Sequence, residues 1–259
     1  MIRALYAAAS GMAAQQLQTD VIANNLANVN TPGYKASRAA FEDLLYQELQ
    51  AGPDTPGPLQ LGNGVRLAAT QRSFQQGSLT RTGEPLHVAI QGPGFLRVRR
   101  EDGTEAYTRD GSLGLSGAGQ LVTAQGLLVL SEFGTPIVVP SGATDVQIGS
   151  DGLVTYWDSQ AQQRVPVGRI GLASFVNPGG LLALGGNLYQ ATPNAGAIQY
   201  GAPGQNGLGT LLPGHLENSN VEVVTEMVNL IVAQRVYELN SRALQSADEM
   251  LGMVNQLRR

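Results

Sequence analysis

The chain has 259 residues, enough for one or two domains, and no cysteine, which excludes a disulfide framework and a thiolate metal site. Charged residues make up 14% of the chain, against a typical value of about 25%, and the net charge is −4. This balance provides no basic surface for nucleic acid. No apolar run reaches the roughly 18 residues of a membrane span, so membrane insertion is not expected. So few charges indicate that partners cover much of the surface.

The first predicted element is an amphipathic helix that starts near residue 5. Its apolar residues recur every three or four positions, and only Asp20 is charged between Ala4 and Tyr34. The seam consists of Leu5, Ala8, Met12, Gln15, Thr19, Ile22, Leu26 and Val29. An uncharged polar face fits either a helix packed on its own domain or one surrounded by neighbouring chains. A weak secretory signal at residues 1–14 is less favoured, because the apolar spacing continues past any cleavage point.

Three asparagines, Asn24, Asn25 and Asn28, lie near the end of this helix, although asparagine disfavours helix interiors. Residues 31–33 follow with the sequence TPG. Pro at the second and Gly at the third position are typical of a type II turn. The helix is therefore expected to end near Asn28.

A second long helix is predicted at the C-terminal end, over roughly forty residues. The sequence SNVE at residues 219–222 fits a capping box, in which the Ser219 hydroxyl accepts from the Glu222 amide. The predicted seam is Val232, Val236, Leu239, Ala243, Met250, Met253 and Leu257, widened by Leu244, Ala247, Leu251 and Val254. The favourable charges expected are the pair Glu238 and Arg242 and, near the negative end of the helix dipole, Arg258 and Arg259.

Between the helices, residues from about 60 to 212 are rich in Gly, Val and Thr, which indicates strands and tight turns. Hairpin turns are predicted at Asp102-Gly103, Asp110-Gly111 and Asp151-Gly152. Strands are predicted at residues 86–90, 95–99, 120–124, 136–140, 145–149 and 153–157. The segments expected to form loops or extended arms are 51–64 and 192–209. The predicted fold class is α+β, with N- and C-terminal helices paired as a coiled-coil-like module and an irregular all-β central domain.

Residues suited to catalysis are few. His87 and His215 each fit a packing or surface role better than that of a base. No metal-type spacing of His or acidic residues occurs, so neither a metal nor a cofactor is expected. The sequence GPGF at residues 92–95 lacks the Lys-Ser/Thr of a phosphate loop and predicts a tight turn before a strand. The candidates for paired carboxylates, an enzyme alternative that ranks last, are Glu84, Glu101 and Glu105.

The sequence ANNLANVNTPGYK, residues 23–35, resembles the N-terminal signature of the bacterial flagellar axial proteins, the family of rod, hook and hook-associated proteins. The similarity covers nearly the whole chain, through FEDLLYQ (41–47), AIQGPGF (89–95), AYTRDGSL (106–113), GQLVTAQG (119–126) and residues 216–251. Within this family, MIRALYAA, FEDLLYQ, YTRDGS and the overall length resemble the distal rod group. Because residues 51–64 are shorter than the corresponding insertion of that group, a proximal rod protein is the alternative.

The resemblance implies a non-enzymatic structural subunit that polymerises into a helical tube. Such a tube would transmit torque from motor to hook as a drive shaft and form part of the export channel. The implied partners are other copies of the chain, proximal rod proteins, the hook protein, the surrounding peptidoglycan and outer-membrane ring proteins, and the flagellar export apparatus. The implied location is the periplasm-spanning rod of the basal body, reached by export without a cleaved signal peptide.

The resemblance also implies a division of labour along the chain. Residues 1–45 and 214–259 would form a helical polymerisation module, residues 46–66 an extended arm, and residues 67–213 a β-rich outer domain. We expect the amides of Asn24, Asn25 and Asn28 to bond neighbouring subunits and fix their register. The full set of expected subunit-interface residues is Leu5, Met12, Asn24, Asn25, Leu26, Asn28, Pro32, Gly33, Tyr34, Phe41, Leu44, Tyr46, Val228, Ile231, Val236, Tyr237, Leu239, Leu244, Met250 and Leu251.

Without the resemblance, the composition also fits a secreted β-rich adhesin with helical oligomerisation ends. A glycan-binding groove would need exposed aromatic residues, but aromatics are only 5% of the chain and Trp157 is the sole tryptophan. Filament formation by the purified chain would favour the axial role, and a saturable ligand would favour the adhesin.

Overall fold

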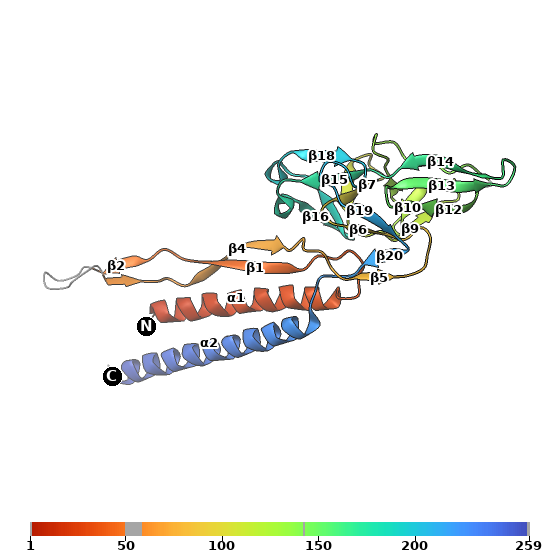
Figure 1. Cartoon of the computed structure of the whole chain (residues 1–259). Helices are drawn as coiled ribbons and strands as arrows, with labels where there is room; N and C mark the ends of the chain where they lie inside the picture. The colour runs from red at the N-terminus through yellow and green to blue at the C-terminus, as the bar shows by residue number, and fades with distance from the viewer. Residues whose placement is uncertain (1, 50–58, 142, 258–259) are drawn as a thin grey trace. The chain divides into compact units, whose positions relative to one another are not determined.

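The computed structural model describes residues 2–49, 59–141 and 143–257, and these fall into two compact units (Figure 1). The helical unit contains the two terminal helices and the described part of residues 37–73. The β-rich unit contains residues 28–36 and the described part of 74–221. The chain is therefore α+β, as predicted, but the units differ from the predicted segments. The described part of residues 37–73 joins the helices, whereas residues 28–36 and 214–221 join the β-rich unit.

The helical unit is built around its N-terminal helix. Its elements are α1 (Ile2–Ala27), β1 (Ser37–Asp43), β2 (Gln47–Leu49), β3 (Leu59–Leu61), β4 (Val65–Arg72) and α2 (Val223–Leu257). Strand β1 pairs antiparallel with β4, and β2 pairs with β3, so the arm expected at residues 46–66 contains a paired ribbon in its described part. Helix α1 contacts α2 on one side and β1 and β4 on the other, and the helices run antiparallel (Figure 1). In its described residues, neither helix is long and apolar enough to cross a membrane.

The predicted end of the first helix is confirmed. Helix α1 ends at Ala27, and the Tyr34 amide donates to the Thr31 carbonyl at 3.3 Å. Gly33 has φ +70°, as the third position of a type II turn requires. A Cβ atom at Gly33 would lie 2.6 Å from the backbone nitrogen of Asp110, so glycine is also needed for close packing.

The capping box predicted for the second helix is wrong. The Ser219 hydroxyl accepts from the Val221 amide at 3.2 Å, whereas the Glu222 carboxylate accepts from the Thr225 hydroxyl at 2.8 Å. The physical reason is that residues 215–217 form β20 and the chain up to Val221 belongs to the β-rich unit, so α2 starts only at Val223. The helix spans 35 residues, close to the predicted length.

The β-rich unit contains short strands and two single-turn 3-10 helices among its described residues. In chain order they are β5 (Leu79–Arg81), β6 (Val88–Gln91), β7 (Phe95–Arg99), β8 (Glu105–Thr108), β9 (Leu113–Leu115), β10 (Leu121–Thr123), β11 (Leu128–Val129), β12 (Thr144–Ile148), β13 (Leu153–Asp158), β14 (Gln163–Arg169), β15 (Leu172–Phe175), η1 (Pro178–Gly180), β16 (Leu182–Gly185), β17 (Leu188–Gln190), η2 (Pro193–Ala195), β18 (Ile198–Gly201), β19 (Thr210–Pro213) and β20 (His215–Glu217).

The largest sheet of this unit has the strand order β16-β17-β8-β7-β11-β10-β9, and β15 pairs with both β7 and β18. Strands β12, β13 and β14 form a separate antiparallel sheet, and β6 pairs with β19 and β5 with β20. The main core is aliphatic, with Val88, Leu96, Leu121, Val154 and Ile170 among its buried residues. A second cluster contains edge-to-face aromatic rings, among them Phe95, Tyr107, Phe175 and Tyr189.

Most predicted strands are confirmed to within two residues, namely those at 86–90, 95–99, 120–124, 145–149 and 153–157, and the GPGF turn does precede β7. The strand predicted at residues 136–140 is wrong: Pro136 and Val138 form only isolated bridges. Proline lacks the amide donor that a continuous ladder needs, which explains the difference. Residues 192–209, expected to be a loop, include η2 and the paired strand β18.

Two of the three predicted hairpin turns are confirmed. Gly103 joins β7 to β8 with φ +81°, and Gly152 joins β12 to β13 with the same φ. The third is wrong, because Asp110-Gly111 lies between β8 and β9, which do not pair with each other. There the Val88 amide donates to the Gly111 carbonyl at 3.0 Å, and any side chain at this glycine would collide with the Val88 carbonyl.

Candidate subunit interface

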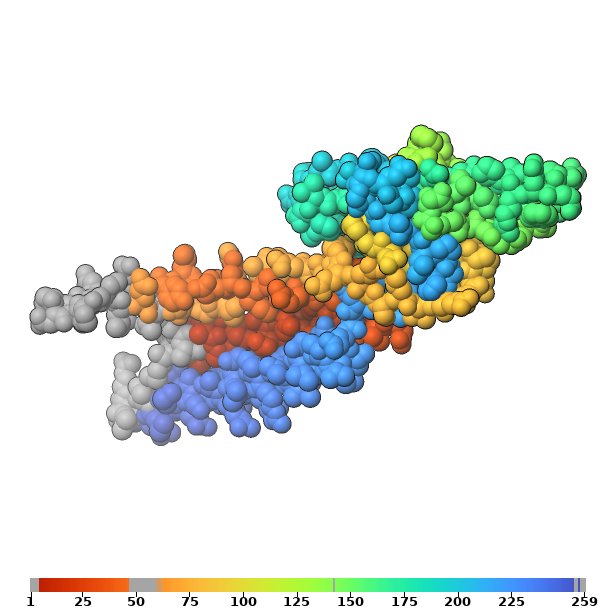
Figure 2. All heavy atoms as spheres, viewed as in Figure 1, coloured from red at the N-terminus to blue at the C-terminus, as the bar shows by residue number. Residues whose placement is uncertain are grey.

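Helix α2 has apolar residues on two opposite sides. At 3.6 residues per turn, Leu230, Ala233, Leu244, Ala247 and Leu251 share the side that packs on α1, and all five are buried or half-buried. We call the opposite side the outer face. Its apolar residues, all exposed, are Val224, Met227, Val228, Ile231, Val232, Leu239, Met250 and Met253. Figure 2 shows α2 along one side of the helical unit.

The seam predicted for this helix is therefore partly wrong. Val232, Leu239, Met250 and Met253 are on the outer face instead of facing α1. Leu244, Ala247 and Leu251, expected only to widen the seam, are on the side that packs on α1. Val236 is half-buried and Ala243 is exposed, and the side chains of Val254 and Leu257, with Arg258 and Arg259, lie outside the described residues. Because both sides are apolar, the periodicity alone could not identify the inner one.

Small side chains allow α1 and α2 to approach closely. A Cβ atom at Gly11 would lie 2.9 Å from the side-chain amide nitrogen of Asn240, so a larger residue there would require the asparagine side chain to move. Ala233 and Ala247 of α2 are 2% and 4% exposed. The predicted α1 seam is confirmed in its described helical part, where Leu5, Ala8, Met12, Gln15, Thr19, Ile22 and Leu26 are all buried or half-buried. The pair predicted between Glu238 and Arg242 is replaced by one between Arg235 and Glu238, at 3.0 Å.

Asn25 serves the chain's own fold rather than a neighbouring subunit, which corrects the expectation for this amide. It is 1% exposed, and its side chain accepts from the Ser37 amide at 2.9 Å and donates to the Ser37 carbonyl at 2.8 Å. The same amide nitrogen donates to Glu226 at 2.9 Å. Asn25 thereby ties α1 to β1 and to the first turn of α2, which explains an asparagine in a helix.

The other expected residues near the turn divide between surface and interior. Asn24 is exposed, and the half-buried Asn28 accepts from the Thr31 hydroxyl at 3.3 Å. Pro32 is half-buried, but Gly33 and Tyr34 are buried within the β-rich unit and offer no surface to a partner. In β1 and the segment that follows it, Phe41 and Leu44 are half-buried, and Tyr46 is 56% exposed.

Of the expected residues on α2, four have exposed side chains on the outer face: Val228, Ile231, Leu239 and Met250. Tyr237 is 44% exposed, and with Gln16 and Thr19 it lines a groove of about 430 Å³ between the helices. These exposed residues, together with Asn24 and Tyr46, remain available as a subunit interface.

A buried charge cluster in the β-rich unit is not among the expected sites. The Lys35 ammonium donates to Glu217 at 2.5 Å and to the Gln75 carbonyl at 2.7 Å. The Arg109 guanidinium donates to the other oxygen of Glu217 at 3.2 Å and to the Gly92 carbonyl at 2.8 Å. Burial lowers the pKa of Lys35 and of Arg109, and in both cases the Glu217 carboxylate opposes the shift. The cluster joins chain segments that are far apart in sequence.

The sequence does contain a signal for this cluster. Lys35, Arg109 and Glu217 all occur in segments quoted above for the family resemblance, within a chain that has few charges. What could not be inferred is that they meet, because Lys35 and Glu217 are 182 residues apart.

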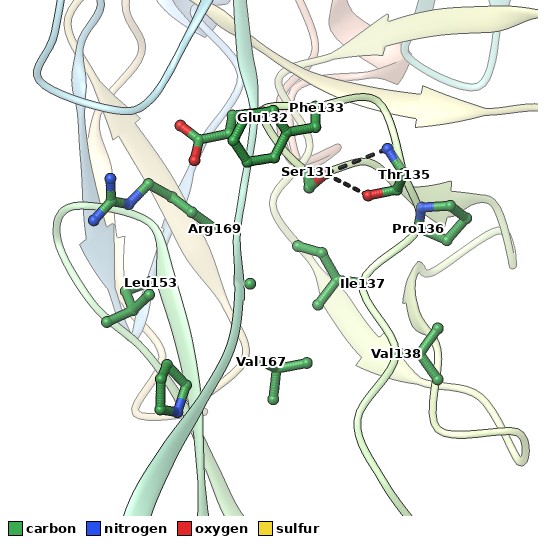
Figure 3. A pocket seen from close by; sticks show the side chains of 12 residues that line it. Ser131, Glu132, Phe133, Thr135, Pro136, Ile137, Val138, Leu153, Val167 and Arg169 are labelled. Atoms are coloured by element: carbon green, nitrogen blue, oxygen red, sulfur yellow. Dashed lines mark hydrogen bonds between the residues drawn. The ribbon is translucent and has the colours of Figure 1, made fainter.

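A cavity of about 470 Å³ on the β-rich unit has the polar residues Ser131, Glu132, Thr135 and Arg169 in its lining (Figure 3). The Ser131 hydroxyl is bonded to that of Thr135 at 2.8 Å, and Arg169 is paired with Asp151. His87 and His215 are bonded to Thr82 and to the Pro213 carbonyl. Glu84 and Glu101 are exposed and Glu105 pairs with Arg97. Among the described residues, no group of three or more His, Asp or Glu could hold a metal ion.

Three family profiles match the chain. They are described as the flagella basal body rod protein, at residues 5–35, the D1 domain of the flagellar hook protein FlgE/F/G, at 89–156, and the C-terminal part of the flagellar basal body rod protein FlgEFG, at 212–257. The first profile ends at Lys35, and the third contains Glu217 and α2. The chain belongs to the flagellar hook and basal-body rod protein family, which confirms the resemblance.

Relatives that match along the whole chain narrow the assignment within this family. The chain is similar to the flagellar basal-body rod protein FlgG of Borreliella burgdorferi, with 46% identity over 100% of both chains. It is 45% identical to FlgG of Caulobacter vibrioides, over 99% of this chain and 100% of the relative, and 38% identical to FlgG of Bacillus subtilis over 100% of both. The flagellar hook-basal body complex protein FlhP of Bacillus subtilis is 35% identical, also over 100% of both chains. The similarity is thus to rod proteins of the FlgG type, in the basal body.

Proposed function

We propose that the chain is a structural subunit of the distal rod of the flagellar basal body, and that it polymerises with copies of itself into a helical tube. Similarity to FlgG along the whole chain supports the distal rod, and the lower identity to FlhP leaves another axial protein as the alternative. The proposed role is mechanical rather than catalytic. The tube transmits torque from the motor to the hook and forms part of the export channel.

The observation that carries polymerisation is the outer face of α2. Ile231, Val228 and Leu239 are 57%, 54% and 63% exposed, and more apolar side chains extend this surface along the helix. Exposed apolar side chains gathered on one side of a helix in this way mark an interaction site in a soluble protein. Because an α-helix rises about 1.5 Å per residue, a surface that runs from Val224 to Met253 is about 45 Å long. Packing between helices of adjacent subunits would bury it.

The helical unit also supplies the module that would pack against neighbouring subunits. Antiparallel α1 and α2 act as a coiled-coil-like module, and each module contacts its neighbours through the outer face and through the exposed residues Asn24 and Tyr46. A contact between two different surfaces repeats without closing and generates an open helical polymer. The ends of the polymer meet the proximal rod proteins and the hook protein, and the ring proteins and peptidoglycan surround it. The subunits reach the tip through the flagellar export apparatus.

The test is electron microscopy of basal bodies from a strain that lacks this gene. We expect short rods without their distal part and hook, and complete rods with a functional hook would overturn the proposal. Complementation with Ile231→Glu should leave the rods short, because a carboxylate on the outer face would be buried without a partner. The matched control is Val176→Glu, which changes an 82% exposed valine of the β-rich unit and should restore the rods. Circular dichroism of both purified variants should match that of the unchanged chain.

A further inference from the structure

The helical unit has a second apolar surface, a groove of about 250 Å³ between α1 and the β1–β4 ribbon. The groove is lined by Leu17, Asp20, Val21 and Asn24 of α1, Ser37 of β1, and Leu67 and Thr70 of β4. Leu17 is 42% exposed, although α1 packs against other elements on two sides. The groove is concave where the outer face of α2 is convex, and both belong to the same unit.

Each of these two surfaces carries at least one charge that has no ion pair among the described residues. Asp20 is exposed, is the only acidic or basic residue in the groove lining, and forms no ion pair with another described residue. Along α2 the cations are Arg235 and Arg242. Arg235 is already paired with Glu238, whereas Arg242 is exposed and has no ion pair among the described residues. Both unpaired charges are therefore available to a partner.

The spacing within the two helices matches as well. Leu239 and Arg242 are three residues apart on the outer face of α2, and Leu17 and Asp20 are three residues apart on α1. Residues three apart are neighbours on a helix surface. A leucine that enters the groove beside Leu17 would therefore bring the arginine one turn away within reach of Asp20. A charge pair at the edge of an apolar contact fixes register and excludes wrong partners more than it adds affinity.

We propose that the occupant of this groove is a second copy of the chain, which inserts Leu239 of its outer face beside Leu17 and Val21 and pairs its Arg242 with Asp20. The inference rests on the proposed polymerisation and specifies which two surfaces meet. Since the groove and the outer face are different surfaces of one unit, the contact is heterologous, and every added subunit presents a new groove or a new outer face.

Charge exchange tests the pair in the deletion strain. Asp20→Arg and Arg242→Asp should each leave rods short, because like charges would meet in the groove, and the double variant should restore rod length and motility. Single variants that build normal rods, or a double variant no better than either single one, would overturn the pairing. If the deletion strain itself builds complete rods, the proposed function fails instead, so the two failures are distinguishable. Circular dichroism should confirm that the single variants fold.

Cross-linking between differently tagged copies tests the leucine contact. Because the chain has no cysteine, Leu17→Cys and Leu239→Cys can be placed in separate chains and produced together in one strain. Oxidation of isolated rods should yield a disulfide dimer that carries both tags. The matched control combines Leu17→Cys with Val176→Cys, an exposed valine outside the helical unit. A yield no higher than that of the control would overturn the contact, whatever the outcome of the charge exchange.

Discussion

The Lys35 ammonium and the Glu217 carboxylate form an ion pair at 2.5 Å, and neither side chain has exposed surface. Lys35 directly follows the Gly-Tyr exit of the N-terminal signature, and Glu217 ends β20 shortly before α2. The Gly33 amide also donates to the Glu217 carbonyl at 2.8 Å. The segment that follows the first helix is thus fixed to the segment that precedes the last one, within the β-rich unit.

Loss of the carboxylate should destabilise this unit strongly. Glu217→Gln leaves Lys35 and Arg109 buried without a counter-charge, and removal of one partner of a buried ion pair costs about 3–5 kcal/mol. Denaturant unfolding followed by the fluorescence of Trp157, the sole tryptophan, measures the effect because β13 belongs to this unit. The control is the exposed Glu84→Gln, which should change stability by less than about 0.5 kcal/mol. Equal effects of the two variants would contradict the role of the cluster.

The pKa of Tyr107 predicts a loss of stability at high pH. Burial, then the hydrogen bond with Tyr200 at 3.0 Å, raises the Tyr107 pKa above its ordinary value of 10.0. The unfolded chain releases this proton at about pH 10 while the folded unit retains it, so stability should fall as the pH rises above 10. In Tyr107→Phe this part of the pH dependence should be missing. Denaturant unfolding of both chains at several alkaline pH values makes the comparison. Lys35, whose pKa is also shifted by burial, is present in both chains and does not distinguish them. Identical slopes of stability against pH in the two chains would refute the assignment.

Asn25 and Asn24 should differ sharply although they are adjacent. Asn25→Leu leaves the backbone amide and carbonyl of Ser37 without this partner, at a cost of about 1–3 kcal/mol for each buried unsatisfied group. Hydrogen exchange at Ser37 should accelerate accordingly. Asn24→Leu, at an exposed position, should leave that exchange unchanged and should impair rod assembly instead. Comparable exchange in the two variants would mean that Asn25 does not hold β1.

Proteolysis of the dilute monomer should release a core with specific ends. The helical unit exposes the apolar outer face of α2 and buries few large side chains, so we expect its ends to open and to be cleaved first. Residues 28–36 belong to the β-rich unit, where Lys35 is fully buried. The resistant fragment should therefore start near residue 28 and end near residue 221, as mass spectrometry can establish. A fragment that starts near residue 74 would contradict this.

Local signals in the sequence were sufficient for local structure. The end of α1 and the turn at Gly33 follow from a proline and a glycine whose backbone preferences leave few alternatives. The sequence predicts strand β7 with its observed ends, because a short alternating run between two glycine turns is typical of a strand. Where proline interrupted the pattern, at residues 136–140, the same reasoning overestimated the strand.

Contacts between distant segments could not be predicted in the same way. The inner side of α2 was misjudged because its sequence is apolar on two sides, and only packing against α1 distinguishes them. Asn25 and Asn24 are adjacent asparagines that look alike in the sequence. Only the burial of Asn25 against Ser37 shows that their roles differ. The charge cluster depends on three residues whose meeting is decided by the strand pairing of the whole β-rich unit.

Substitutions on the two apolar sides of α2 should have different effects, one on the amount of the protein in the cell and the other on its assembly. A polar substitution at Ala233 or Ala247 would weaken the contact with α1, so that the chain would be degraded and its level in the cell would fall. A polar substitution at Val228 or Ile231 would leave that contact intact, and the cell would accumulate a normal amount of a chain that cannot be added to the rod. Alternate positions of one helix would thus divide into two genetic classes, and immunoblotting beside a swimming assay would tell them apart.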